Sequence, residues 1–182
     1  MMSMRTGTRT SNSLYRMAAL VAAAFLALSP AFAADVGDIP PDELGNTDGG
    51  KDVRLSDSEG RIRIVTFWAT WCPPCLKELP VLNAIQNQAG TSRVQVIAIN
   101  LKESRRQYRK AREAFTDFNV TFVHDARGKV GERFGVKAIP YMLIIDVDGR
   151  VAYKHVGYDD SELENIVGEI NTLLTRNNLG VP

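Results

Sequence analysis

The junction between an apolar strand and a helix constrains this chain more than any other feature, because it holds both of the protein's cysteines. Residues 62–68 are almost continuously apolar, as expected for a strand buried on both faces. The segment Trp71–Cys75 (WCPPC) follows, and its two prolines suit the first turn of a helix, where a missing N–H group costs nothing. Cys72 would then lie at the helix N-terminus and Cys75 one turn later, which is the spacing of a redox-active dithiol.

The position of each cysteine predicts its chemical role. Free N–H groups and the helix dipole stabilise a thiolate at Cys72, which lowers its pKa and makes it the expected nucleophile. Cys75 is expected to resolve the mixed disulfide. A static disulfide over this short step would close almost no loop and stabilise little. A zinc site would need His124 and His155, whose spacing does not fit zinc-finger intervals, so we predict no metal site and no cofactor.

The first 33 residues are typical of an export signal. Residues 1–16 hold three arginines and no acid, residues 17–28 are an unbroken apolar run, and Ala31–Ala33 is an A-x-A cleavage site. We therefore predict a cleaved signal peptide over residues 1–33. The alternative is an N-terminal membrane anchor, which the alanines and Pro30 disfavour. The whole chain has 22 basic and 21 acidic side chains, a balance that indicates no nucleic-acid partner.

The rest of the chain is expected to form one domain. Residues 34–51 are polar and rich in Gly, Pro and Asp, which predicts a flexible lead-in before a domain at 52–176 and a C-terminal tail at 177–182. The order of strand and helix patterns predicts an α/β fold, with a central mixed sheet and helices on both faces. The expected strands cover 52–56, 62–68, 94–100, 120–123, 141–146 and 150–155, and the expected helices cover 73–88, 103–118, 129–134 and 161–175.

The segment Phe67–Cys75 (FWATWCPPC), followed by Glu78-Leu79-Pro80, resembles the thioredoxin superfamily and in particular its exported TlpA/ResA/DsbE branch. The resemblance extends from about residue 52 to residue 175. Three further segments resemble family features: the cis-proline at Ala138-Ile139-Pro140, the turn between the last two strands at Asp146–Gly149, and the helix-and-strand insert of this branch at Glu103–Val123.

This resemblance implies a thioredoxin-like fold and a periplasmic thiol–disulfide oxidoreductase. Members of the branch usually act as reductants, often in cytochrome c maturation or copper-enzyme assembly. The implied partners are disulfide-containing envelope proteins and a membrane thiol reductant. The resemblance also implies a cis bond before Pro140, which would offer the backbone of Ile139 to an extended substrate strand. Trp71 and Tyr141 would form an apolar rim, or alternatively serve in packing.

One position departs from the thioredoxin pattern. Thioredoxin itself carries a buried acid just before Phe67, whereas this chain has Thr66. Glu78 lies three residues after Cys75 on the same helix face, so we predict that it replaces that acid as the proton acceptor for Cys75. The alternative is a solvated glutamate in the second turn of the helix.

Two other functions stay open from the sequence. A disulfide-donating oxidase would need a strongly stabilised thiolate, and the Pro73-Pro74 dipeptide supplies no basic side chain for that purpose. A non-enzymatic copper-binding thiol chaperone would need His124 or His155 beside the cysteines as a third ligand.

Overall fold

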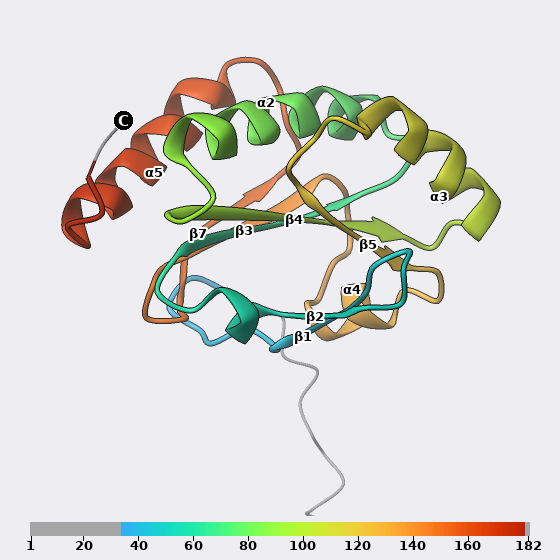
Figure 1. Cartoon of the computed structure of the whole chain (residues 1–182), viewed down its shortest axis with the longest axis horizontal. Helices are drawn as coiled ribbons and strands as arrows, with labels where there is room; N and C mark the ends of the chain where they lie inside the picture. The colour runs from blue at the N-terminus through green and yellow to red at the C-terminus, as the bar shows by residue number, and fades with distance from the viewer. Residues whose placement is uncertain (1–33, 181–182) are drawn as a thin grey trace, which may run out of the picture. The chain divides into compact units, whose positions relative to one another are not determined.

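The computed structural model describes residues 34–180, so the predicted signal peptide lies outside the described residues. The main sheet has the strand order β5-β4-β3-β6-β7 (Figure 1). β3 is parallel to β4, β4 is parallel to β5, and β6 is antiparallel to both β3 and β7. The predicted mixed sheet is therefore confirmed. Its strands are β3 (Ile62–Trp68), β4 (Val94–Leu101), β5 (Thr121–Asp125), β6 (Tyr141–Ile145) and β7 (Val151–Val156).

Both faces of this sheet are covered. The helices α2 (Pro73–Ala89), α3 (Arg105–Arg112) and α5 (Glu162–Arg176) lie on one face, and α4 (Lys129–Arg133) lies on the other (Figure 1). Side chains of β3 alternate between the two buried clusters: Ile64 and Trp68 pack on the α2 and α5 side, and Val65 and Phe67 pack on the opposite side. Burial on both faces explains why this strand is apolar along most of its length.

Residues 34–51 were predicted to be a flexible lead-in, but part of this segment belongs to a small hairpin. β1 (Glu43–Asn46) pairs antiparallel with β2 (Asp52–Arg54). Leu44 of β1 is fully buried in the same cluster as Val65 and Phe67, and Ala34 is also buried. Leu44 is the single apolar residue of β1, so the strand shows no alternating pattern and could not be recognised from the sequence.

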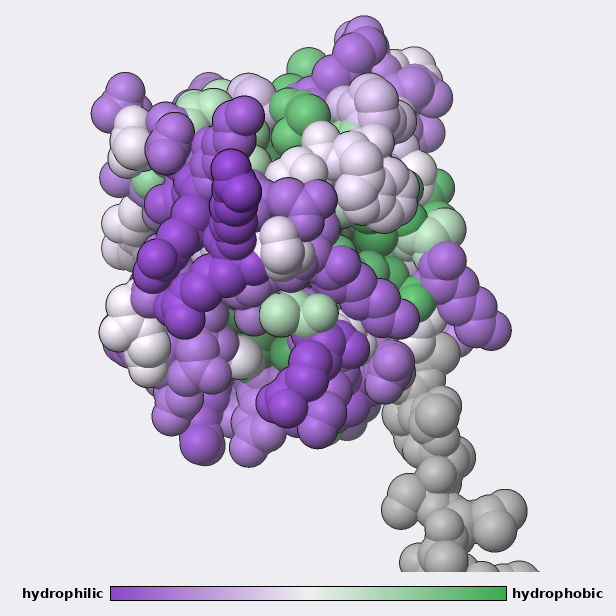
Figure 2. Space-filling view, turned by 90° about the vertical axis from the view of Figure 1, so that its right-hand side faces the viewer, coloured by the Kyte–Doolittle hydropathy of each residue, from purple (hydrophilic) through white to green (hydrophobic). Residues whose placement is uncertain are grey.

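The predicted insert is present but shorter in its helix than expected. α3 begins after Ser104, whose side chain accepts a hydrogen bond from the Gln107 N–H, and it passes into a 3₁₀ turn at Glu113–Phe115. Figure 2 views the side of the molecule where α3 lies and shows a largely hydrophilic surface. Asp48 of the hairpin loop forms ion pairs with both Arg105 and Arg109 of this helix.

The remaining boundaries differ from the predictions by one or two residues, except that a 3₁₀ turn at Leu55–Ser58 replaces the end of the strand predicted at 52–56. α2 continues through Pro80 to Ala89. Within residues 34–180, no helix combines the length and the apolar character that crossing a membrane requires.

Candidate active site

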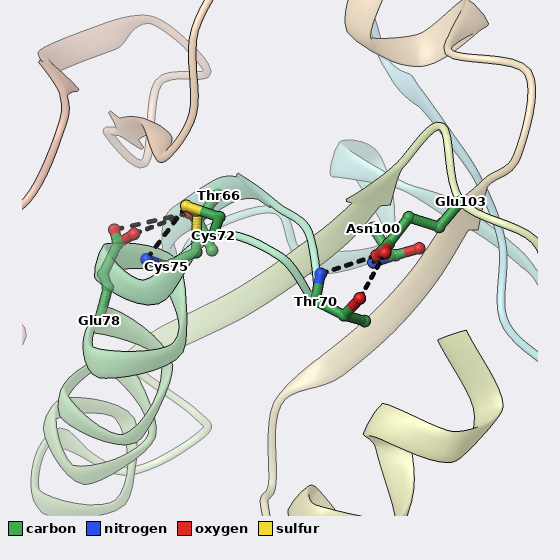
Figure 3. The surroundings of a disulfide bond; sticks show 7 residues. All are labelled: Thr66, Thr70, Cys72, Cys75, Glu78, Asn100 and Glu103. Carbon is green, nitrogen blue, oxygen red and sulfur yellow. Dashed lines mark hydrogen bonds between the residues drawn. A yellow bond between two sulfur atoms is a disulfide. The ribbon is translucent and has the colours of Figure 1, made fainter. Parts of the chain in front are cut away.

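Both cysteines lie where β3 ends and α2 begins. The chain turns over Ala69–Cys72, and the Cys72 N–H closes this turn by donating to the Ala69 carbonyl (3.2 Å). Cys72 is the N-cap residue of α2, and the Cys75 N–H points at its Sγ (3.3 Å). The two residues form a disulfide with their Cα atoms 5.3 Å apart (Figure 3). The predicted position of the dithiol, at a helix N-terminus, is thus confirmed.

The two sulfur-bearing residues differ in accessibility. Cys72 keeps 4 % of its surface exposed, whereas Cys75 is completely buried. A partner thiol can therefore reach the disulfide only from the side of Cys72. This asymmetry is the one that a nucleophile and a resolving cysteine require.

Glu78 is a buried acid beside the disulfide, and the alternative of a solvated side chain is wrong. Its residue is only 2 % exposed, and its two carboxylate oxygens lie 3.5 and 3.3 Å from the Thr66 hydroxyl, which donates to them (Figure 3). Burial raises the pKa of Glu78 to about 8, although the hydrogen bond from Thr66 lowers it in part. The group therefore exchanges a proton near neutral pH.

The segment before β6 meets the cysteine turn at the same end of the sheet. The Ile139–Pro140 bond is cis, as predicted. Tyr141 pairs with Phe67 of β3, so Pro140 lies level with the end of that strand, where the turn to Cys72 begins. Ile139 is partly buried against the cluster that contains both cysteines.

The two aromatic residues predicted as a rim have different environments. Trp71 is 68 % exposed, next to Cys72. Tyr141 is buried, and its hydroxyl lies within hydrogen-bonding distance of the carbonyls of Ala34 (3.1 Å) and Phe134 (3.3 Å). Of the two interpretations left open for Tyr141, the structure therefore supports packing.

The two histidines that a zinc or copper site would need have other partners. The His124 ring stacks on Tyr108 with a centroid distance of 4.6 Å. The Nε2 atom of His155 is 2.7 Å from a carboxylate oxygen of Glu169. Within residues 34–180, no three side chains of the metal-binding types gather in one place.

A second carboxylate near the turn was not foreseen from the sequence. Glu103 is 5 % exposed, and one of its oxygens accepts bonds from the Thr70 N–H (2.8 Å) and from Asn100 Nδ2 (2.6 Å). Its other oxygen accepts a bond from the Thr70 hydroxyl (Figure 3). The signal that could have found it is topological: β3 and β4 are parallel neighbours, so polar residues that follow their carboxyl ends lie together.

Comparisons with known proteins agree with this geometry. The Redoxin family model matches residues 30–170. The thiol-disulfide oxidoreductase ResA of Geobacillus thermodenitrificans is 32 % identical over 118 residues, which are 64 % of this chain and 66 % of ResA. The thiol:disulfide interchange protein DsbE of Allochromatium vinosum is 30 % identical over 123 residues, which are 68 % of this chain and 65 % of DsbE. The alignments thus span just under two thirds of these two relatives.

The fold is shared with solved structures as well. A crystal structure from Chlorobium tepidum, assigned as a DsbE thiol:disulfide interchange protein, superposes with a TM-score of 0.67 at 30 % identity. The match covers 78 % of this chain and 99 % of that one. With the family model, the curated relatives and the structure in agreement, the chain belongs to the redoxin family, in the TlpA/ResA/DsbE-like branch of the thioredoxin superfamily.

Proposed function

We propose that this protein is an exported thiol–disulfide oxidoreductase that reduces disulfides of cell-envelope proteins through Cys72 and Cys75. The observation that carries the proposal is the Cys72–Cys75 pair at the N-terminus of α2, with Cys72 keeping 4 % of its surface exposed and Cys75 completely buried. The names of the relatives, ResA and DsbE, support the same class of reaction.

The first step takes place at Cys72. Its thiolate attacks one sulfur of the substrate disulfide, the substrate S–S bond breaks, and the second substrate sulfur leaves as a thiolate that takes up a proton. The Cys75 N–H, which points at Cys72 Sγ (3.3 Å), and the dipole of α2 favour the Cys72 thiolate, so its pKa is expected to lie below the free-thiol value of about 8.5. The product is a mixed disulfide between Cys72 and the substrate.

The second step releases the substrate and needs a base. Cys75 loses its proton to Glu78 and attacks Cys72 Sγ, which forms the Cys72–Cys75 disulfide and expels the second substrate thiolate. The pair has then lost two electrons and the substrate has gained two. A thiol reductant at the membrane, such as the relatives' branch implies, would return the two electrons and reopen the pair.

Glu78 suits this role because it is buried on the same helix face as Cys75 and has a pKa of about 8. A carboxyl group that titrates near the working pH accepts a proton and passes it on without a large energetic penalty in either direction. Within residues 34–180, the Thr66 hydroxyl is the one donor that reaches the Glu78 carboxylate, and a hydroxyl is no base near neutral pH.

The substrate is proposed to bind in an extended conformation beside the cysteines. The backbone of Ile139 before Pro140 would pair with the substrate strand, and the exposed ring of Trp71 would cover an apolar side chain near the substrate cysteine. The predicted signal peptide supports a periplasmic location, and the branch suggests cytochrome c maturation or copper-enzyme assembly as the process.

Trapping of the mixed disulfide tests this assignment. In Cys75→Ser, a disulfide-containing peptide is expected to stay attached to Cys72, because no second thiol can release it. In Cys72→Ser, little trapping is expected, since Cys75 is buried. Mass spectrometry of the adducts reads out both variants, and trapping through Cys75 alone would contradict the roles given to the two residues.

Equilibration in a glutathione redox buffer tests the direction of the reaction. A reductase is expected to have a reduction potential near that of thioredoxin, about −270 mV, rather than that of DsbA, about −120 mV. A value near the second figure would favour the alternative of a disulfide-donating oxidase and overturn the proposed direction.

A further inference from the structure

The turn that presents Cys72 is held at two points. One is the bond from the Cys72 N–H to the Ala69 carbonyl, inside the turn. The other comes from outside it, because Glu103 accepts both hydrogen bonds that Thr70 can donate, one from its backbone and one from its hydroxyl (Figure 3). Thr70 is the second residue of the turn, so fixing it also fixes the path of Trp71 and Cys72.

Glu103 is itself held from several elements. Asn100 at the end of β4 donates to its carboxylate (2.6 Å). The Nε2 atom of His124 in β5 lies 2.9 Å from the backbone carbonyl oxygen of Glu103. The His124 ring also stacks on Tyr108 of α3. The carboxylate is thus held by Thr70 and Asn100, and the backbone of Glu103, the first residue of the insert at Glu103–Val123, is held by His124.

The need for such an anchor depends on the redox state. In the oxidised protein the bond between Cys72 and Cys75 restrains the turn covalently. Reduction removes that restraint, and the turn must then be kept in place by hydrogen bonds alone. A nucleophile that moves by about 1 Å loses up to about a hundredfold in rate, so the noncovalent anchor matters most in the reduced state.

We propose that Glu103 is a positioning residue for Cys72, which fixes the turn 69–72 through Thr70 and so keeps the reduced Cys72 sulfur at the N-terminus of α2. The inference rests on the proposed function, in which Cys72 is the attacking residue. It gives the insert a direct part in the chemistry of the dithiol.

The test measures Cys72 alone, in a Cys75→Ser background, by its rate of alkylation with iodoacetamide over a range of pH. Thr70→Val keeps the shape of the side chain and removes only the hydroxyl donor. It is expected to slow alkylation at pH 7 about threefold, and Glu103→Ala about tenfold. In both, the pKa of Cys72 taken from the pH profile should rise toward the free value of about 8.5. Thr70→Ser keeps the hydroxyl donor, so its alkylation rate should stay close to that of the protein with Thr70.

The effect of the lost charge and the effect of the lost anchor on the alkylation rate have opposite signs, so the experiment separates them. Loss of the Glu103 carboxylate would by itself favour a nearby thiolate and speed alkylation, whereas loss of the anchor slows it. Thr70→Val changes no charge at all. Slower alkylation in both variants therefore indicates positioning, and faster alkylation in Glu103→Ala with no change in Thr70→Val would overturn the proposal.

The protein contains a matched control. Ser56 donates from its backbone N–H (2.8 Å) and from its hydroxyl (3.0 Å) to the carboxylate of Asp42, in the same geometry but away from the cysteines. This pair is exposed, whereas the Thr70–Glu103 pair is partly buried, so Ser56→Ala is expected to lower the stability less than Thr70→Val does and to leave the Cys72 rate unchanged. If Thr70→Val also lowers the stability but leaves the alkylation rate and the pKa of Cys72 unchanged, the role of Glu103 is purely structural and the proposal is wrong.

Two further outcomes are separable. If Glu103→Ala does not fold, the pair Thr70→Val and Thr70→Ser still decides. Alkylation needs no disulfide partner, so a wild-type protein that alkylates rapidly but exchanges with no disulfide would contradict the proposed function while leaving the positioning test intact.

Discussion

Glu78 and Glu103 are both buried glutamates, and they lie on opposite sides of the cysteine turn in Figure 3. Glu78 faces a single hydroxyl at 3.3 to 3.5 Å, and its pKa is raised to about 8 by burial. Glu103 receives three donors, two of them from Thr70. Burial alone therefore does not give the two acids the same surroundings: a single hydroxyl reaches Glu78, whereas three donors hold Glu103 and make it an anchor for Thr70.

The largest expected difference between the two acids is in stability against pH. Because the pKa of Glu78 is about 8 in the folded protein and has its ordinary value of 4.5 in the unfolded chain, the folded protein binds one more proton between these values. The stability of the wild type should therefore fall as pH rises through this window. The Glu78→Gln variant has no acid to ionise at this position. Its free energy of unfolding, relative to that of the wild type, should therefore rise by about 3–4 kcal/mol between pH 5 and pH 8.

Denaturant unfolding of the oxidised proteins at both pH values measures this gain. Glu103→Gln is the matched comparison, since it loses an anionic acceptor for three donors. It is expected to be less stable than the wild type by about 1–3 kcal/mol at pH 7. If Glu78→Gln and Glu103→Gln both lose stability at pH 8, the contrast between the two acids is wrong.

The next largest effect is kinetic. Glu78→Gln should slow the resolution of the mixed disulfide by Cys75 by about a hundredfold, and it should leave the attack by Cys72 nearly unchanged. The gap should widen as pH rises toward 8, where Glu78 ionises, and narrow again once Cys75 ionises unaided. Rapid-quench measurement of the mixed disulfide separates the two steps. An effect of Glu78→Gln that does not vary with pH would contradict the role of Glu78 as proton acceptor for Cys75.

The smallest effect concerns Thr66. Its hydroxyl lowers the pKa of Glu78 by donating to the ionised carboxylate. Thr66→Val keeps the volume and removes the donor, so the pKa of Glu78 should rise further above about 8. The pH profile of the resolution step should then shift upward by less than about one unit. A downward shift would show that the hydroxyl favours the protonated acid instead.

The sequence was sufficient where the chemistry is local. Cys72, Cys75 and Glu78 are spaced along one helix, so their common face follows from helical geometry alone. The strands β3, β4 and β6 of the main sheet were likewise marked by mainly apolar segments. Their boundaries shifted by only a residue or two, because the ends of elements depend on caps rather than on the apolar pattern.

What could not be predicted depends on contacts between distant segments. Glu103 and Thr70 are 33 positions apart, and only the parallel pairing of β3 with β4 brings them together. Leu44 is buried through packing against strands of the main sheet, although its own neighbours are polar. Tyr141 was ambiguous because an aromatic ring suits a binding rim and a core equally well, and its partners Ala34 and Phe134 decide between them.

The short span of the disulfide has a consequence for how the protein matures. It links residues three positions apart, while the sheet around it joins strands from both halves of the domain. A cross-link over so few residues removes little freedom from the unfolded chain. The newly made polypeptide is therefore expected to reach its native fold before any oxidant acts on its cysteines, and to depend on no disulfide-forming catalyst for its own assembly.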